Sequence, residues 1–386
     1  MTLTPSFQSP FIAEREFAKS PRAEPSTTGL LRTGTVPRFK ASQGFEIRIP
    51  KEESFRQFMR RALYDVERGY YMARVGTVGA RGDFSTSATL SPVLSGAIAN
   101  WLKAEAKALP GVRTIIEVGG GNGSLMEGVL KSMGWWARRK FRVVMVETSP
   151  VLKAQQTQRL KGRVTCWKNT LREALGACRG EALIFHNELL DAFPVSVVQW
   201  DAQAGKWAEL WIKHQADGRV VEELRPLILL AEEHSVLRDW SQKIPLGQRC
   251  ELHEDARAWF HEWIPAWRRG SMLSIDYGDQ FPSLYARRPA GTLRGYVLQQ
   301  RVEGRMVYEN VGRQDLTVDV NFTDVRRWLE TMGCRETSYA TQAEFIAQWQ
   351  GARRRVSGEA DRFVTDTEGA GGAFKCLTVR QQDGRA

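Results

Sequence analysis

Residues 114–124 read Thr-Ile-Ile-Glu-Val-Gly-Gly-Gly-Asn-Gly-Ser, and this stretch decides the fold. A buried apolar run at 114–118 leads into glycines and then into the helical pattern of 124–132. Glycine has no Cβ and reaches positive φ, so a ligand can lie directly against this backbone. The amides that open the helix supply hydrogen-bond donors. The stretch therefore predicts a ligand-binding turn at the carboxyl end of a strand.

The chain continues with short apolar runs that alternate with helical stretches. We expect strands at 141–146, 164–167 and 182–186, with a helix at 150–160. Strands that alternate with helices predict a parallel sheet covered on both faces, which is an α/β fold.

Beyond residue 195 the pattern changes and indicates an inserted lobe. Apolar runs at 195–200 and 207–212 flank a turn and predict a β-hairpin, and 220–268 has a helical pattern. The tryptophans that recur every fourth residue there are interpreted as packing residues: Trp259, Trp263 and Trp267. A strand, a helix and a closing strand are expected later, at 272–277, 324–332 and 374–379.

Five segments follow from these patterns. The first 45 residues are rich in Ser, Thr and Pro without periodicity, which predicts a disordered extension. A helix then begins after Ser54, a suitable N-cap. The segments are an extension (1–45), an N-terminal helical and loop segment over the cofactor site (46–110), a cofactor-binding core (111–194), the inserted hairpin and helical lobe (195–270) and the remainder of the core (271–386).

Composition and charge disfavour several classes of protein. The net charge is +11, but the basic residues are scattered, and the densest runs are 138–140 and 353–355. A solvated basic surface is the better interpretation, and a nucleic-acid partner stays open. Five widely spaced cysteines without a CxxC pair indicate free thiols in a reducing compartment.

No metal site and no membrane span are expected. His253 and His261 are eight residues apart without an HExxH motif. No apolar run approaches the roughly 20 residues of a membrane span. The N-terminus lacks the basic and apolar regions of a secretory signal. We therefore expect a soluble intracellular protein, cytoplasmic in location.

The glycine spacing bears on the class of ligand. Gly119, Gly121 and Gly123 give GxGxG, and Ser124 stands where a dinucleotide-binding loop has its third glycine. Glu147 ends the next strand, 24 residues after Gly123, where its carboxylate can accept hydrogen bonds from ribose hydroxyls. Together with Glu117, which opens the loop, this favours S-adenosylmethionine over a dinucleotide. A nicotinamide-dependent dehydrogenase remains the alternative.

A second polar group, at residues 186–194, follows the strand at 182–186. Ligands of open α/β sheets bind outside the carboxyl ends of the strands, so these side chains should line the cleft. Glu188 and Asp191 are expected to hold and polarise a guanidinium or amine acceptor, as the catalytic residues. The alternative is that Asp191 is only the N-cap of a following helix. His186 is interpreted as a packed residue.

A series of motifs along residues 50–380 resembles the MidA family of S-adenosylmethionine-dependent methyltransferases, which are related to the mitochondrial complex I assembly-factor arginine methyltransferase. The matching residues are Phe55, Met59, Leu63, Tyr64, Gly69-Tyr70-Tyr71, Gly82-Asp83-Phe84, Thr86-Ser87, Glu117, Gly119, Gly121, Gly123, Leu125, Glu147, Ser149-Pro150, Leu152, Gln155, Asn187-Glu188, Asp191-Ala192, Pro194, Asp276-Tyr277-Gly278, Gly291–Tyr296 and Asp315-Leu316-Thr317.

The resemblance implies a Rossmann-like, seven-stranded class I methyltransferase sheet with an inserted lobe and an N-terminal helical segment. It implies that S-adenosylmethionine lies over the glycine loop, and that the 79–87 loop folds over it. Asn187 joins the cofactor contacts on this basis: Gly82, Asp83, Phe84, Thr86, Ser87, Glu117, Gly119, Gly121, Gly123, Glu147 and Asn187. Asp276, Tyr277 and Arg294 are expected on the acceptor side. A protein arginine substrate, a homodimer and, in a eukaryote, a mitochondrial location complete the expectation.

The sequence departs from the family pattern on the acceptor side. Ala88 and Thr89 replace Pro and Glu, 297–299 lack the usual basic residue and histidine, and Asn321 stands where an acid is usual. Losing acids near a pocket for a guanidinium weakens the arginine assignment. A catalytically inactive assembly factor and an RNA methyltransferase therefore stay open as alternatives.

Overall fold

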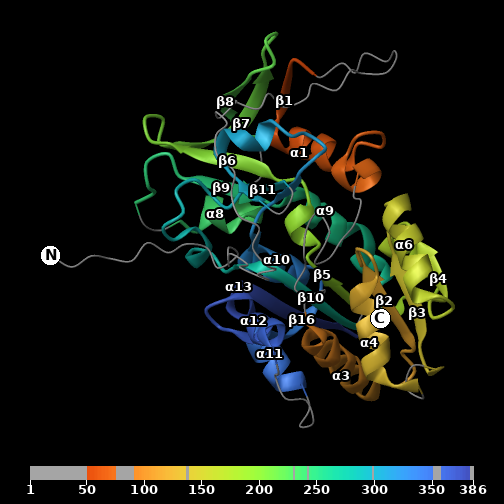
Figure 1. Ribbon diagram of the computed structural model, residues 1–386. Coiled ribbons are helices and arrows are strands. Elements are labelled where there is room, and N and C mark those ends of the chain that lie inside the picture. The colour runs from red at the N-terminus through yellow and green to blue at the C-terminus, as the bar shows by residue number, and fades with distance from the viewer. Residues whose placement is uncertain are drawn as a thin grey trace, which may run out of the picture.

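A computed structural model describes residues 50–74, 91–135, 139–228, 231–240, 243–297, 300–350 and 358–382 (Figure 1). Its central sheet has the order β15-β16-β10-β5-β2-β3-β4, with β14 pairing with the end of β10. The pairs along β10, β5, β2, β3 and β4 are parallel, and β16 is antiparallel to both its neighbours. The strands are β2 (Thr114–Val118), β3 (Arg142–Val146), β4 (Cys166–Lys168), β5 (Glu181–Asn187), β10 (Arg269–Asp279), β14 (Val320–Asn321), β15 (Arg335–Thr341) and β16 (Phe374–Gln381). The predicted seven-stranded methyltransferase sheet is confirmed, with β14 as a short addition.

Two apolar cores cover the two faces of this sheet. Successive residues of β2 point to opposite faces, so Ile115 belongs to one core and Ile116 to the other. The first face is covered by α3 (Pro92–Ala108), α4 (Ser124–Met133), α6 (Pro150–Leu160), α11 (Gln342–Trp349), α12 (Glu359–Thr365) and α13 (Ala370–Ala373). The second is covered by α7 (Leu171–Gly176), α9 (Glu254–Trp263) and α10 (Phe322–Thr331).

The tryptophan stripe belongs to the second core. Trp263 and Trp267 are 1% exposed, and Trp259 packs against the same cluster. The interpretation of the stripe as packing is confirmed. No helix in the described part of the chain is long and apolar enough to cross a membrane.

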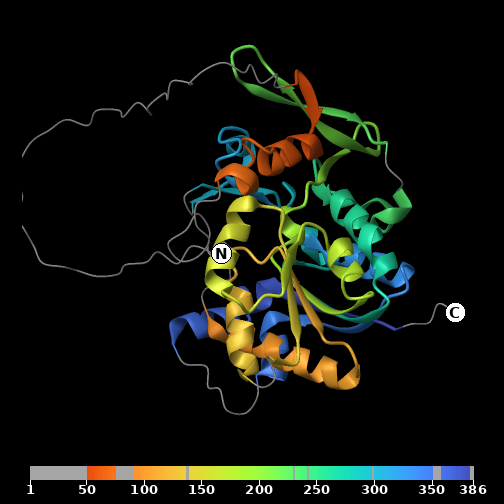
Figure 2. The same ribbon diagram turned by 90° about the vertical axis from the view of Figure 1, so that its right-hand side faces the viewer.

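The inserted lobe contains a five-stranded antiparallel sheet, which lies at the end of the molecule opposite α3 and α11 (Figures 1 and 2). The N-terminal segment contributes one strand and the helix α1 (Phe55–Tyr64), whose N-cap is Ser54 as predicted. The predicted hairpin is present as β6 and β7. The strands are β1 (Glu52–Ser54), β6 (Ser196–Asp201), β7 (Lys206–His214), β8 (Val220–Pro226) and β9 (Arg249–Leu252).

The helical prediction for 220–268 is wrong over β8 and β9; in the described part of this range, the α-helices are α8 (Ser235–Arg238) and α9. Cross-strand pairing overrides local propensity, because β8 pairs with β7 along its whole length. Glu223 of β8 also pairs with Lys213 of β7, and Arg225 of β8 pairs with Glu52 of β1.

A third, three-stranded sheet lies between residues 294 and 317, in a region where no strand was predicted. It has the order β12-β11-β13, with antiparallel pairing. Its strands are β11 (Arg294–Val297), β12 (Gln300–Val302) and β13 (Asp315–Thr317). It packs beside α1, and Leu316 of β13 shares an apolar cluster with Phe58 of α1.

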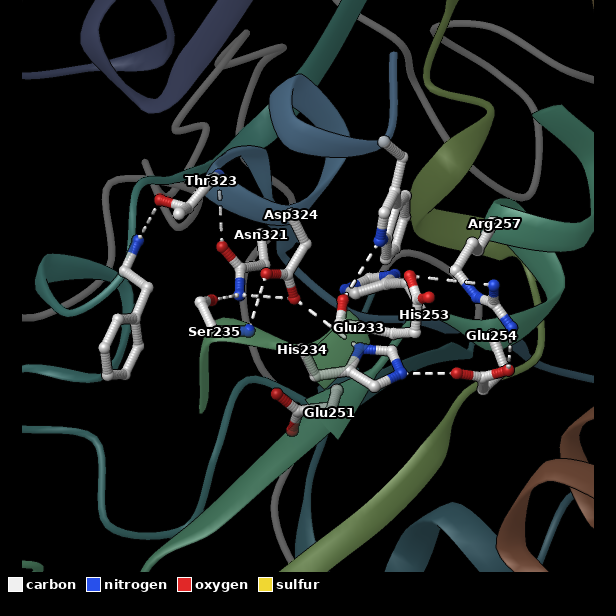
Figure 3. A network of polar contacts seen from close by, with 12 residues as sticks. Glu233, His234, Ser235, Glu251, His253, Glu254, Arg257, Asn321, Thr323 and Asp324 are labelled. Carbon is white, nitrogen blue, oxygen red and sulfur yellow. Dashed lines mark hydrogen bonds and ion pairs between the residues drawn. The ribbon is translucent and has the colours of Figure 1, made fainter. Parts of the chain in front are cut away.

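A buried charged cluster joins the lobe to the core (Figure 3). The His234 side chain is fully buried between two carboxylates, with Nε2 hydrogen-bonded to Glu254 of α9 and Nδ1 3.6 Å from Oδ2 of Asp324 in α10. Asp324 also accepts the Ser235 N–H through Oδ1 at 2.8 Å. Burial lowers the His234 pKa, but the two carboxylates raise it by more, so it lies above its ordinary value. The imidazolium therefore links three segments of chain.

We expect His234→Gln to lower the free energy of unfolding by roughly 3 kcal/mol at pH 6, because it leaves buried carboxylates without their cation. A raised folded-state pKa gives stability that is fully present below about pH 6.5 and is lost as pH rises through the folded value. Urea unfolding between pH 6 and 9 should show this loss in the wild type and in the exposed-site control His261→Gln, but not in His234→Gln. Identical profiles for all three would contradict the assignment.

Candidate cofactor and acceptor site

The glycine loop after β2 has backbone angles that suit glycine. Gly119 has φ 65° and Gly123 has φ 82°, both in the left-handed region. A Cβ on Gly119 would lie 2.7 Å from Cδ1 of Leu189, so the loop also packs closely against the turn after β5. The Gly119 N–H donates to the Val146 carbonyl at 2.9 Å and ties the loop to β3.

Glu117 lies beneath this loop and is 1% exposed. A Cβ on Gly120 would come within 2.9 Å of its Oε2, so the loop closes over the carboxyl only because residue 120 is glycine. Oε2 has no hydrogen-bond partner among the described residues. Burial and the charge of Glu147 raise the Glu117 pKa to about 8. A buried acceptor left open in this position fits a ligand that carries donors and positive charge, as S-adenosylmethionine does.

Glu147 directly follows β3 and is 6% exposed. Its Oε1 accepts the Ser149 N–H at 2.9 Å, and its Oε2 accepts from Nε2 of Gln156 at 3.0 Å. Burial raises the Glu147 pKa, and these two bonds oppose the rise. Each carboxylate oxygen can accept a further bond, so Glu147 keeps the two acceptors that a ribose diol would need.

Gln156 was missed by the sequence reasoning, which noted only its neighbour Gln155. Leu152, Gln156 and Leu160 recur every four residues and are all buried on α6. That spacing could have placed Gln156 on the inner face of the helix.

The turn after β5 carries the predicted acceptor residues. Glu188 has φ 52°, an unusual angle for a residue with a side chain, and its Oε1 accepts from Nδ2 of Asn187 at 2.9 Å. Asp276 of β10 holds this turn, since its Oδ2 accepts the N–H groups of Leu189 at 3.1 Å and Leu190 at 2.9 Å. Asp276 is fully buried in this role, so the structure places it behind the turn and not on the acceptor surface.

Asp191 is not a helix N-cap. It lies in a 3₁₀ turn, η2 (Leu190–Ala192), and strand β6 follows. Its Oδ2 accepts from Oγ1 of Thr317 at 2.8 Å and from the Tyr277 hydroxyl. Its Oδ1 has no hydrogen-bond partner in the described part of the chain, although the residue is only 6% exposed. Burial raises the Asp191 pKa.

Arg294 supports Tyr277 and is already paired. Its Nη1 donates to Oδ1 of Asp319 at 2.6 Å and to the Thr292 carbonyl at 3.0 Å. Its guanidinium carbon lies 4.6 Å from the centre of the Tyr277 ring. Because Arg294 is 8% exposed and its charge is balanced by Asp319, the predicted direct contact with substrate is not supported by its position.

Tyr71 and Asp315 lie beside this group of residues. Sequence reasoning gave them no role, although both lie in the quoted motifs. The Tyr71 hydroxyl donates to Oδ1 of Asp315 at 2.7 Å. Ser149 lies two residues beyond Glu147, and its hydroxyl donates to the Tyr71 carbonyl at 2.7 Å. Burial and the charge of Asp191 raise the Asp315 pKa to about 7. Tyr71 therefore joins the cofactor side to the acceptor side.

Gly82, Asp83, Phe84, Thr86 and Ser87, and the substitutions at 88–89, lie outside the described residues. Asn321 is the N-cap of α10, and its Oδ1 accepts the Thr323 N–H at 3.2 Å. Its Nδ2 donates to Asp324 and Ser235, so the acid missing at 321 is replaced by a helix cap. Asn321 is fully buried in this role, and the effect of the change on the acceptor stays a prediction.

The sheet order, the glycine loop and the acid after β3 define a class I S-adenosylmethionine-dependent methyltransferase. The chain belongs to a family described as S-adenosyl-L-methionine-dependent methyltransferases, whose model matches residues 97–340. The predicted MidA-like family and the predicted cofactor are confirmed.

Relatives and a solved structure agree with this family. The Drosophila melanogaster protein arginine methyltransferase NDUFAF7 homolog, mitochondrial, is 27% identical and the alignment covers 77% of this chain and 71% of that protein. The Xenopus tropicalis protein arginine methyltransferase NDUFAF7, mitochondrial, is 25% identical, and the alignment covers 78% of this chain and 73% of that protein. The crystal structure of a likely methyl transferase from Burkholderia thailandensis, bound to S-adenosyl-homocysteine, superimposes with a TM-score of 0.74 and 26% sequence identity. The match covers 87% of this chain and 89% of that chain.

We expect Glu147→Ala to weaken binding of S-adenosylhomocysteine by roughly tenfold to a hundredfold, because it removes charged acceptors worth about 1.5–3 kcal/mol from the ribose. Isothermal titration measures the change, with the exposed-site variant Glu330→Ala as the matched control. Equal affinities of the wild type and Glu147→Ala would contradict the placement of the ribose.

Proposed function

We propose that this methyltransferase acts on a protein, at a nitrogen of an arginine side chain held by Glu188 and Asp191. The observation that carries the proposal is the buried Asp191 carboxylate, which has one oxygen without a hydrogen-bond partner among the described residues and lies on the turn that packs against the glycine loop. The curated relatives are named as protein arginine methyltransferases, which supports the same acceptor.

The charge balance around Asp191 supports a cationic acceptor. Asp315 and Asp276 are buried nearby, burial raises the pKa of each, and the charge of Asp191 raises both further. Arg294 faces this group, but it is paired with Asp319. These buried carboxylates outnumber the cations beside them, so an incoming cation stabilises their charged form. A planar guanidinium can make paired hydrogen bonds to them.

Methyl transfer requires the acceptor to be placed in line with the reactive carbon more than it requires an acid or a base. When bound, S-adenosylmethionine supplies an electrophilic methyl group on a sulfonium. The residues of this chain provide the orientation: Asp276 fixes the turn, and the hydroxyls of Tyr277 and Thr317 fix the Asp191 carboxylate. The side chain of Glu188 is partly exposed, and we infer that it contacts the acceptor.

The location and the assembly of the protein remain proposals. The curated relatives are named as mitochondrial, and we infer the same compartment for this chain if its source is a eukaryote. The homodimer is still a prediction from the resemblance alone.

Transfer of tritiated methyl groups into a protein extract tests the function. We expect label in proteins that yields methylarginine after acid hydrolysis and survives ribonuclease. Loss of the label with ribonuclease would indicate RNA as acceptor, label in another amino acid would overturn arginine, and no label despite cofactor binding would indicate an inactive assembly factor.

We expect Asp315→Asn to lower methyl transfer by roughly tenfold, through the loss of a charge-assisted contact worth about 1.5 kcal/mol to a cation, while S-adenosylhomocysteine binding changes less than about twofold. Asp315 ionises as pH rises through about 7, so wild-type transfer should rise over that range and the variant should lack this rise. Rates from pH 5.5 to 8.5 measure both effects. Asp217→Asn, at an exposed hairpin, is the control, and a variant profile like that of the control would refute the role.

A further inference from the structure

Gln156 uses every polar atom of its side chain within the cofactor half of the site. It is fully buried on α6. Its Nε2 donates to the Gly121 carbonyl at 2.9 Å and to Oε2 of Glu147 at 3.0 Å, and its Oε1 accepts from Nε1 of Trp167 at 3.0 Å. One side chain therefore contacts the glycine loop, the acid after β3 and strand β4.

Trp167 determines which way the amide of Gln156 faces. An indole N–H can only donate, so the carbonyl oxygen of Gln156 must point at Trp167. Its NH₂ group must then point at Gly121 and Glu147, both of which offer only acceptors there. Trp167 is itself held by β4, where it pairs in register with Met145 of β3.

No other common side chain satisfies these three partners. Glutamate at 156 would direct a carboxylate at the Glu147 carboxylate and at a carbonyl, and an apolar residue would leave all three without this partner. The loop also touches the helix directly, since a Cβ on Gly123 would lie 3.4 Å from Cα of Gln156. The amide thus holds the Glu147 carboxylate at a set distance from the loop.

We propose that Gln156 is a positioning residue for the cofactor: it orients the Glu147 carboxylate toward the ribose diol, and the protein distinguishes ribose from deoxyribose through it. The Ser149 N–H holds the other oxygen of Glu147, so the carboxylate is fixed at both ends. Without the amide, Glu147 keeps one anchor and can rotate, and the two ribose hydroxyls lose their paired acceptor. Because this inference concerns the cofactor alone, it does not depend on the acceptor proposed above.

Isothermal titration with S-adenosylhomocysteine and with its 2′-deoxy and 3′-deoxy analogues tests the inference. The wild type should prefer the ribose ligand, and Gln156→Met should weaken that ligand by about tenfold while changing the deoxy analogues much less, because a hydrogen bond to a charged group is lost. The preference for ribose should therefore collapse. Gln158→Met, an exposed glutamine on the same helix, should leave it intact.

A second variant guards against misfolding. Trp167→Phe keeps an aromatic ring but removes the donor that sets the amide, and it should reduce the ribose preference in the same direction. If Gln156→Met weakened the binding of all three ligands by the same factor, the role of Gln156 would be merely structural and the proposal would be overturned. A wild type that binds all three ligands equally, or a Gln156→Met variant with the wild-type preference, would overturn it as well.

Discussion

The parallel pairing of β2 with both β3 and β5 is the constraint on which the whole site depends. Val118 is level with Val146 on one side and with His186 on the other. The next residue of each strand is therefore Gly119, Glu147 or Asn187, and the three emerge together at one edge of the sheet. The glycine loop, the acid proposed to bind the ribose and the turn proposed to hold the acceptor follow from this register, since each begins at a strand end that its neighbour fixes.

The two halves of the site are held by different parts of the chain. The cofactor half uses the core sheet and α6, where Glu147 and Gln156 face the glycine loop. The proposed acceptor half also needs the small three-stranded sheet, because Thr317 of β13 holds Asp191 and Asp315 of the same strand accepts from Tyr71. A change in the small sheet can therefore alter the proposed acceptor side and leave the cofactor contacts in place.

The sequence predicted the core sheet because its strands are short apolar runs separated by well-capped helices. It failed over β8, whose strand character comes from its partner β7. It also gave no role to Gln156, which is defined by contacts with a loop, an acid and a neighbouring strand that only the folded chain brings together. Asp276 and Arg294 were predicted on the acceptor side, and the structure shows Asp276 holding the turn after β5 and Arg294 lying over the Tyr277 ring. Their carboxylate and guanidinium are turned toward the protein, where they contact a strained turn and a half-buried tyrosine. Chemistry at a site is readable from sequence, but the direction of each side chain is not.

A crystal structure of the protein with S-adenosylhomocysteine tests the central claim most directly, that one strand edge brings the cofactor and the acceptor together. The account predicts both ribose hydroxyls on the Glu147 carboxylate, with the thioether sulfur directed toward the turn that carries Glu188 and Asp191. A ligand whose ribose lies away from Glu147, or whose sulfur faces away from that turn, would contradict it.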